Sequence, residues 1–340
     1  MSESPILPPP LFLARAAARP STPAATTTTA AAAAAASTPS STDASSLAAV
    51  EQQQAQPVHS DGFVPRVALT PSQVQAIEQL QEKLNVPGWT VRQWRYIHEG
   101  GCLARYLRAR DWDVEKAHQL MLGTLTWREE FKVHEISPED PLIVEEGLTG
   151  KTYRHGRDRA GRPIIYMKPR FQNTKNYAEQ VRYTVHHLEQ AMRSMNLHEG
   201  VEQMTLLIDF QGYSVMNAPP MSQTKEVMSI LLNCYPERLG LALMVDAPFL
   251  FNMAYKVVYP FLPTETRKKI HFISGNQQSK ATSLSQHIDL ETLEHDYGGL
   301  VKAKYDSAAY TKAEAEELGR FKAHHADLES KETDVPPQKA

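Results

Sequence analysis

Short apolar runs alternate with segments of helical period through the second half of this 340-residue chain. The predicted strands cover residues 163–167, 204–210, 241–246 and 269–273, and the predicted helices between them cover 176–195, 220–233 and 249–261. A helix of this length forms the right-handed crossover that joins two parallel strands. The pattern therefore predicts an α/β domain with a mainly parallel sheet over residues 140–302.

Residues 68–135 carry the signals of a small, all-helical lobe. Thr70, Pro71 and Gln73 form a helix start, with a capping residue, a proline in the first turn and a glutamine that completes a capping box. The segment "GCLARYLRARDWD" predicts a basic helix that ends near Arg110, and Asp113 caps a longer helix. Apolar residues recur with helical period along that longer helix, at Val114, Ala117, Met121, Leu125 and Phe131.

The two ends of the chain have a different composition. Residues 1–62 are rich in Ala, Ser, Thr and Pro and have few large apolar side chains, so we expect them to be disordered. Their first part contains Arg15 and Arg19 and only one acid before Asp43, which faintly resembles an organelle transit peptide. Residues 303–340 predict at most one amphipathic helix followed by a disordered tail.

Overall charge and cysteine usage narrow the class of protein. The chain has 36 basic and 39 acidic residues, a net charge of −3, which argues against wholesale nucleic-acid binding. Cys102 and Cys234 show no repeated spacing and are expected to be reduced, buried thiols. We expect a cytoplasmic monomer without a cofactor, and the transit-peptide alternative stays open.

Enzymatic signatures are absent or incomplete. In "GLTGKT" Glu145 stands where a phosphate-binding loop needs its first glycine. The adjacent pairs His186-His187 and His324-His325 are predicted to be surface or core histidines, because neighbours on a helix point about 100° apart. Asp209 ends a predicted strand. It is either a catalytic acid or a carboxylate that accepts hydrogen bonds from the following turn. The chain is predicted not to be an enzyme.

The segment from Gly240 to Pro263 is long and apolar, but charged and polar residues interrupt it, so it does not predict a membrane span. Its helix has apolar side chains around most of its circumference and must bury both sides. It is either a central core helix or a gate with one face on a cavity and one on a membrane. The candidate gate residues are Phe249, Phe251, Tyr255, Val258, Tyr259 and Phe261.

Six segments occur in the order found in a known family: "LARYLRARDWDVEKA", "DRAGRP", "LLIDFQGYS", "YPERLG", "APFLFNMAYKVVYPFL" and "LEHDYGGL". Over about residues 95–300 the chain thereby resembles the CRAL-TRIO (Sec-fourteen-like) lipid-binding proteins. The resemblance implies an N-terminal helical tripod, and then a sheet with helices that enclose one lipid in an apolar cavity beneath a movable gate helix. It makes residues 249–261 the gate.

The resemblance also implies a headgroup site. In phosphatidylinositol-transfer members, the positions that match Arg110, Thr266 and Lys269 hold the headgroup phosphate, and the position of Glu237 pairs with that lysine or with the inositol. Pairing of this kind is needed because a buried phosphodiester is costly unless it is paired and hydrogen-bonded. Arg238 is expected to be structural and to tie the turn to Asp209 or Asp246.

Two departures qualify the resemblance. Thr264 stands where the family has a proline before the site threonine. The family's choline contacts match Met204, Leu206 and Ile165, which are apolar here, and only Tyr153 is kept. The resemblance therefore implies phosphatidylinositol binding and transfer at membrane surfaces, with a lipid kinase as a partner to which lipid is presented. A membrane-docked signalling adaptor, or a carrier of another apolar ligand or cofactor, is the alternative.

Overall fold

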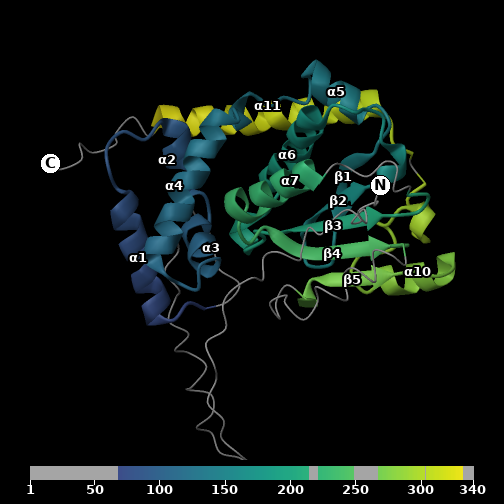
Figure 1. Cartoon of the computed structure of the whole chain (residues 1–340), viewed down its shortest axis with the longest axis horizontal. Helices are drawn as coiled ribbons and strands as arrows, with labels where there is room; N and C mark the ends of the chain where they lie inside the picture. Colours follow the sequence, from purple (N-terminus) through teal and green to yellow (C-terminus); the bar gives the residue numbers. More distant parts are fainter. Residues whose placement is uncertain (1–67, 214–220, 249–266, 303, 332–340) are drawn as a thin grey trace, which may run out of the picture.

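The computed structural model describes residues 68–213, 221–248, 267–302 and 304–331. The predicted disordered segment 1–62, the predicted gate 249–261 and the C-terminal residues 332–340 lie outside the described residues. The description therefore covers the helical lobe, the sheet with its helices and the C-terminal helix (Figure 1).

The N-terminal lobe is helical, as predicted. Its helices are α1 (Pro71–Leu84), α2 (Val91–His98), α3 (Cys102–Arg108) and α4 (Val114–Glu130). Thr70 and Gln73 form the predicted capping box of α1, and the Asp113 carboxylate accepts from the Lys116 backbone N–H at the start of α4. The basic helix α3 ends before Arg110, because Asp111 and Trp112 adopt positive φ values of 52° and 63° that no helix can continue.

The sheet has five strands in the order β1-β2-β3-β4-β5. They are β1 (Thr152–Arg157), β2 (Pro163–Met167), β3 (Met204–Asp209), β4 (Leu239–Val245) and β5 (Ile270–Ile273). Strands β2 to β5 pair in parallel, so the predicted mainly parallel sheet is confirmed, while β1 is antiparallel to β2. Strand β1 was not predicted from the sequence, because "TYRHGR" buries only Tyr153 and has no apolar alternation.

Residues opposite each other in the sheet share a face, because side chains alternate along each strand. One face carries Ile165, Leu206 and Ala242. Helices α6 (Tyr177–Arg193) and α7 (Met221–Cys234) pack against it at Ile165 and Leu206, so we call it the helix face. The opposite face carries Tyr166, Leu207 and Leu243. It packs on α10 (Gln277–Leu284), on the short 3-10 helix His295–Tyr297 and on the segment between them, and we call it the C-terminal face.

The helical lobe and the helix face of the sheet share one hydrophobic core, which contains lobe residues such as Leu80 and Met121 together with Ile165 and Met204. Helix α4 packs against α7, and the Thr124 hydroxyl donates to the carbonyl of Asn233 at 2.8 Å. The predicted C-terminal helix is α11 (Ser307–Lys331), which runs beside α5 (Pro141–Gly147) and past α6 (Figure 1).

The two cysteines are free and buried, as predicted. Burial raises the pKa of Cys102 to about 11 and that of Cys234 to about 12. We expect iodoacetamide at pH 7.5 to alkylate either thiol in the native protein at least about a hundredfold more slowly than in the denatured protein, because the thiolate is the nucleophile. Mass spectrometry of timed samples measures both rates. Alkylation at equal rates in native and denatured protein would contradict the burial of these thiols.

Candidate functional site

Glu237 and Lys269 lie together where the chain enters strands β4 and β5. The two strands are parallel, so their amino ends lie at the same edge of the sheet, and the Ala242 backbone N–H donates to the Lys269 carbonyl at 2.6 Å. Lys269 Nζ is 3.6 Å from Glu237 Oε2, and the side chains are 23% and 33% exposed. Glu237 has a φ of 57°, which turns the chain out of α7 and into β4. The structure thus brings together two of the four residues predicted to form the headgroup site.

The other two predicted headgroup residues are Arg110 and Thr266. Arg110 lies in the turn after α3, is half-buried and donates from Nη1 to the Ala109 carbonyl at 2.9 Å. Thr266 lies outside the described residues. The grouping of Arg110 and Thr266 with the Glu237–Lys269 pair stays a prediction.

Arg238 joins the sheet to the helical lobe. Its side chain is almost fully buried, Nη2 lies 3.1 Å from Glu99 Oε1, and Nη1 donates to the Glu202 carbonyl at 3.0 Å. The prediction that Arg238 is structural is confirmed, but both partners predicted for it are wrong. Asp209 and Asp246 lie at the carboxyl ends of β3 and β4, about 20 Å along the strands from the start of β4, so Arg238 cannot reach them.

Glu202 extends this contact into an ion cluster between the lobe and the sheet. Arg108 of α3 forms an ion pair with one carboxylate oxygen of Glu202, and buried Arg105 Nη1 lies 3.6 Å from the other. We call Glu99, Arg105, Arg108, Glu202 and Arg238 the lobe–sheet ion cluster. Glu237 directly precedes Arg238, and Arg110 follows α3, which carries Arg105 and Arg108. The cluster therefore holds the segments that contain Glu237 and Arg110 at the junction between the lobe and the sheet. The sequence analysis missed Glu99, Arg105, Arg108 and Glu202, whose partners are distant along the chain.

The three predicted cavity residues of the sheet lie on one face, because Met204 and Leu206 are two residues apart on β3 and Ile165 lies opposite Leu206 on β2. Ile165 pairs with Leu206 across β2 and β3, and both point to the helix face with Met204. Ile165 and Met204 are each 2% exposed and pack in the core shared with the lobe. Leu206 also packs on a second cluster of the helix face, which contains Ile208, Phe210, Ala242, Met244 and Ile270. The six candidate gate residues lie outside the described residues.

Tyr153 does not belong with these cavity residues. It pairs with Tyr166 across β1 and β2 and packs with it on the C-terminal face, with ring centroids 5.4 Å apart. Its hydroxyl donates to Glu294 Oε1 at 2.5 Å. The sequence analysis treated Tyr153 as a retained choline contact, but the pleat places it on the side of the sheet away from Ile165 and Leu206.

Tyr153 instead contributes to a buried polar network that holds the "LEHDYGGL" segment on the sheet. Lys168 Nζ is 2.8 Å from Glu294 Oε2 and lies over the rings of Tyr153 and Tyr297, at 5.2 and 5.5 Å from the ring centroids. Burial, followed by the nearby Glu294 carboxylate, raises the pKa of Tyr153 far above its ordinary value. We call Tyr153, Lys168, Glu294 and Tyr297 the tyrosine–lysine network.

Asp209, at the end of β3, lies beside this network. It was predicted to be either a catalytic acid or a carboxylate that accepts hydrogen bonds from the following turn. Its Oδ1 accepts from the Gln211 backbone N–H at 2.9 Å, as the structural interpretation requires. Its Oδ2 accepts from Arg170 at 2.5 Å and from the Tyr297 hydroxyl at 2.9 Å. Because both carboxylate oxygens already accept hydrogen bonds from protein groups, the structural interpretation is confirmed.

The incomplete phosphate-loop motif is also structural. Lys151 is 4% exposed and forms an ion pair with buried Glu146, and that carboxylate also accepts from the Thr174 hydroxyl at 2.5 Å. Burial lowers the pKa of Lys151, although Glu146 opposes this effect. Lys151 therefore forms a buried ion pair with Glu146 at the end of α5 and does not project into a loop that could hold a nucleotide.

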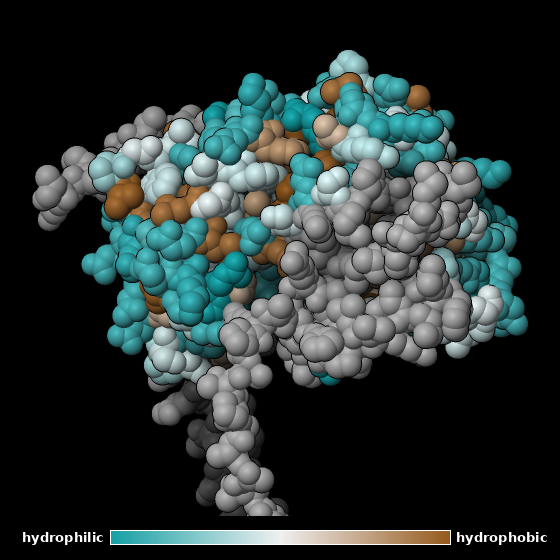
Figure 2. Space-filling view, in the orientation of Figure 1, coloured by the Kyte–Doolittle hydropathy of each residue, from teal (hydrophilic) through white to brown (hydrophobic). Residues whose placement is uncertain are grey.

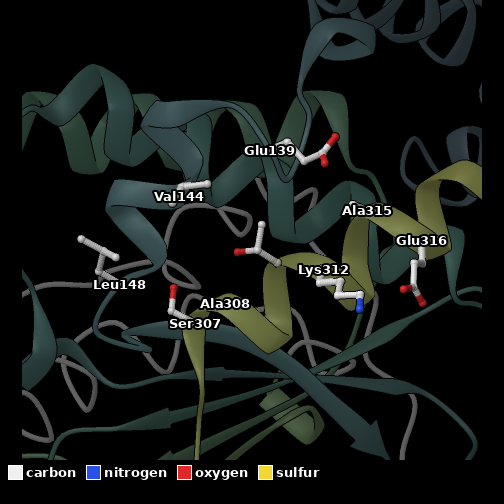
Figure 3. A pocket seen from close by; sticks show the side chains of 9 residues that line it. Glu139, Val144, Leu148, Ser307, Ala308, Lys312, Ala315 and Glu316 are labelled. Atoms are coloured by element: carbon white, nitrogen blue, oxygen red, sulfur yellow. The ribbon is translucent and has the colours of Figure 1, made fainter.

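An open groove of about 770 Å³ lies between α5 and the first turns of α11 (Figure 3). Its lining combines apolar and charged side chains, namely Glu139, Val144, Leu148, Ser307, Ala308, Thr311, Lys312, Ala315 and Glu316. Among the described residues, none of the predicted headgroup or sheet cavity positions lines this groove. It is therefore separate from the candidate site at the lobe–sheet junction.

The surface of the described residues in Figure 2 is largely hydrophilic, and hydrophobic residues gather over the helical lobe. Among the helices of the described ranges, none is both long and apolar enough to cross a bilayer.

Two family models match most of the described chain. Residues 76–123 match the CRAL/TRIO N-terminal domain and residues 148–299 match the CRAL/TRIO domain. The chain is 37% identical over 209 residues to a CRAL-TRIO domain-containing protein of Schizosaccharomyces pombe, which is 62% of this chain and 20% of that protein. It is 33% identical over 219 residues to phosphatidylinositol transfer protein PDR17 of Saccharomyces cerevisiae, which is 62% of this chain and 60% of that protein.

A solved structure shares the fold. The crystal structure of Sfh5 aligns with a TM-score of 0.51 and 18% sequence identity, over 72% of this chain and 92% of that chain.

Proposed function

The chain belongs to the CRAL/TRIO family of lipid-binding proteins, and on that premise we propose that it binds phosphatidylinositol and transfers it between membranes without catalysing a reaction. The observation that carries the proposal is the Glu237–Lys269 pair at the entrance of two apolar strands. The relative PDR17, by its name a phosphatidylinositol transfer protein, supports the choice of lipid.

The geometry of the pair suits an anionic headgroup. The separation of 3.6 Å is longer than the 2.7–2.9 Å of a charge-assisted hydrogen bond. The ammonium group of Lys269 has three N–H groups that can donate hydrogen bonds to a phosphate. Glu237 can accept hydrogen bonds from inositol hydroxyls while it holds the lysine in place. In this proposal Arg110 and Thr266 complete the phosphate site from the lobe and from the segment before β5.

The apolar part of the site begins directly beside the charged pair. Ile270 follows Lys269 and pairs with Ala242, and both contribute to the helix-face cluster with Ile208 and Met244. A lipid with its phosphate at Lys269 would therefore lay its acyl chains along the helix face of β3 to β5, where burial of apolar area is favourable. The small side chain of Ala242 takes up little of this face.

In the proposed mechanism residues 249–261 form the gate over this face. Exposure of their large side chains to water costs free energy in proportion to apolar area, and a bilayer surface removes that cost. The membrane therefore favours the open state, in which lipid enters or leaves. Presentation of the bound lipid to a lipid kinase at the same surface is part of the proposal.

Lipid identity tests the proposal directly. We expect mass spectrometry of lipid extracted from the purified full chain to show phosphatidylinositol, and we expect the protein to transfer it between vesicles. Phosphatidylcholine transfer should be weak, because Met204, Leu206 and Ile165 offer no hydroxyl to a choline headgroup. Heat-inactivated protein serves as the control. Robust phosphatidylcholine transfer, or a purified protein that neither contains nor takes up phosphatidylinositol, would contradict this proposal.

A further inference from the structure

A buried cluster of possible metal ligands joins α6 to α11, away from the proposed lipid site. His186 and His187 of α6 and Glu314 of α11 are 1%, 2% and 6% exposed. One ligating atom from each of the three side chains lies within 4.8 Å of a ligating atom of both others. His186 and His187, predicted to be surface or core histidines, are buried, and the tertiary structure places the Glu314 carboxylate beside them.

The hydrogen bonds of the cluster determine which histidine nitrogens carry a proton. His186 Nε2 lies 3.1 Å from Glu314 Oε2, and His187 Nδ1 lies 3.4 Å from Gln190 Oε1. The same Gln190 oxygen accepts from the Tyr310 hydroxyl at 3.0 Å, which identifies it as an acceptor. Each of these histidine nitrogens faces an acceptor and therefore carries the hydrogen in the neutral ring.

The remaining ligating atoms point to a cation. In the neutral rings His186 Nδ1 and His187 Nε2 are unprotonated lone-pair acceptors, and Glu314 Oε1 is a carboxylate oxygen. Within the described part of the chain, all three atoms are buried without a hydrogen-bond partner. Three buried acceptors without a donor are unfavourable. A cation between the three side chains would satisfy His187 Nε2 and Glu314 Oε1, and it would replace the proton on His186 Nε2, the ring nitrogen that faces Glu314.

We propose that His186, His187 and Glu314 form a transition-metal site of the zinc class that ties the C-terminal helix α11 to α6. Two imidazole nitrogens and one carboxylate oxygen are a known zinc ligand set, with bonds of about 2.0–2.2 Å. Metal binding would draw the three side chains closer together than they lie here, where the ring centroids of His186 and His187 are 5.1 Å apart. His186 and His187 are neighbours on α6, but a ligating atom of each lies within 4.8 Å of the other and of Glu314, so both can contribute to one site.

The charges around the cluster favour zinc over harder cations. Arg154 and Arg193 both act on the cluster electrostatically, and Arg154 forms an ion pair with Glu317. Calcium and magnesium need several oxygen ligands, and this site offers one carboxylate with cationic groups nearby. Imidazole ligands suit zinc and related metals, whose binding depends less on negative charge. We therefore expect zinc to bind in the presence of millimolar calcium and magnesium.

The test uses the full, tag-free chain after treatment with EDTA. We expect the protein to take up one zinc ion per chain by elemental mass spectrometry, to show visible absorption with cobalt, and to gain thermal stability with zinc. Substitution of a residue that only hydrogen-bonds to a metal ligand already weakens metal binding, and loss of the ligand itself weakens it more. The variants His187→Gln and Glu314→Gln should therefore weaken zinc binding by roughly a hundredfold or more. Exposed His324, also on α11, provides the matched control His324→Gln, which should bind zinc as the native chain does.

Metal uptake is measured both with the native protein and with protein refolded from denaturant in the presence of zinc, so that slow access to a buried site does not mask binding. Circular dichroism confirms that each variant is folded. Absence of uptake in both preparations would overturn the proposal, as would undiminished stoichiometric uptake by the folded double variant His187→Gln/Glu314→Gln. Neither result bears on lipid transfer, because the site and the lipid-binding face share no residues.

Discussion

Replacement of Lys269 by alanine is expected to slow phosphatidylinositol transfer between vesicles by about 30-fold or more. The substitution removes the ammonium group that the proposed function assigns to the lipid phosphate and leaves Glu237 beside that phosphate. Truncation of one partner of a buried charge pair costs roughly 2–5 kcal/mol. Lys269 and Glu237 are 23% and 33% exposed, so solvent screening places the expected loss near the lower end of this range.

The adjacent Lys268 offers a matched control, because it carries the same charge and is exposed. Lys268→Ala should transfer lipid at nearly the native rate, and circular dichroism should show that both variants are folded. Arg110→Ala tests the lobe side of the same phosphate site and should also reduce transfer. The site assignment is wrong if folded Lys269→Ala transfers phosphatidylinositol at the native rate. Equal losses in both lysine variants would point to a general effect of surface charge.

Replacement of Glu294 by alanine is expected to lower the free energy of unfolding by about 3–5 kcal/mol, because it leaves a buried lysine without its partner. Lys168 and Glu294 side chains are 7% and 12% exposed, and their charged atoms are 2.8 Å apart. The same change removes the acceptor of the Tyr153 hydroxyl. Asp296, at 3.9 Å from Lys168 Nζ but 66% exposed, can compensate only in part.

Two further variants separate charge from packing in this network. Glu294→Gln retains an acceptor for Tyr153 and should cost less than Glu294→Ala. The double variant Lys168→Met/Glu294→Leu removes both charges and should regain much of the lost stability, since apolar pairs often replace buried ion pairs at little cost. Urea unfolding followed by circular dichroism measures all four proteins. A double variant less stable than Glu294→Ala would mean that the pair is not the source of the destabilisation.

The sequence determined the local structure of this protein to a large extent. The capping residues Thr70 and Asp113 start helices where predicted, and the apolar run 163–167 forms β2 without a shift of either end. These features depend on backbone sterics and on residues a few positions apart, so a single sequence carries them. The ordered motifs of the family added the expected roles of Glu237 and Lys269, which no local pattern indicates.

The tertiary structure alone decided which distant polar side chains meet. Arg238 pairs with Glu99, 139 residues away, although Asp209 and Asp246 had been predicted as its partners. Glu314 lies against His186 across 128 residues, and Glu294 lies against Lys168 across 126. A charged side chain can pair with any opposite charge that the fold brings near. Its partner is therefore set by how helices and strands pack, and the local sequence around either residue contains no record of that choice.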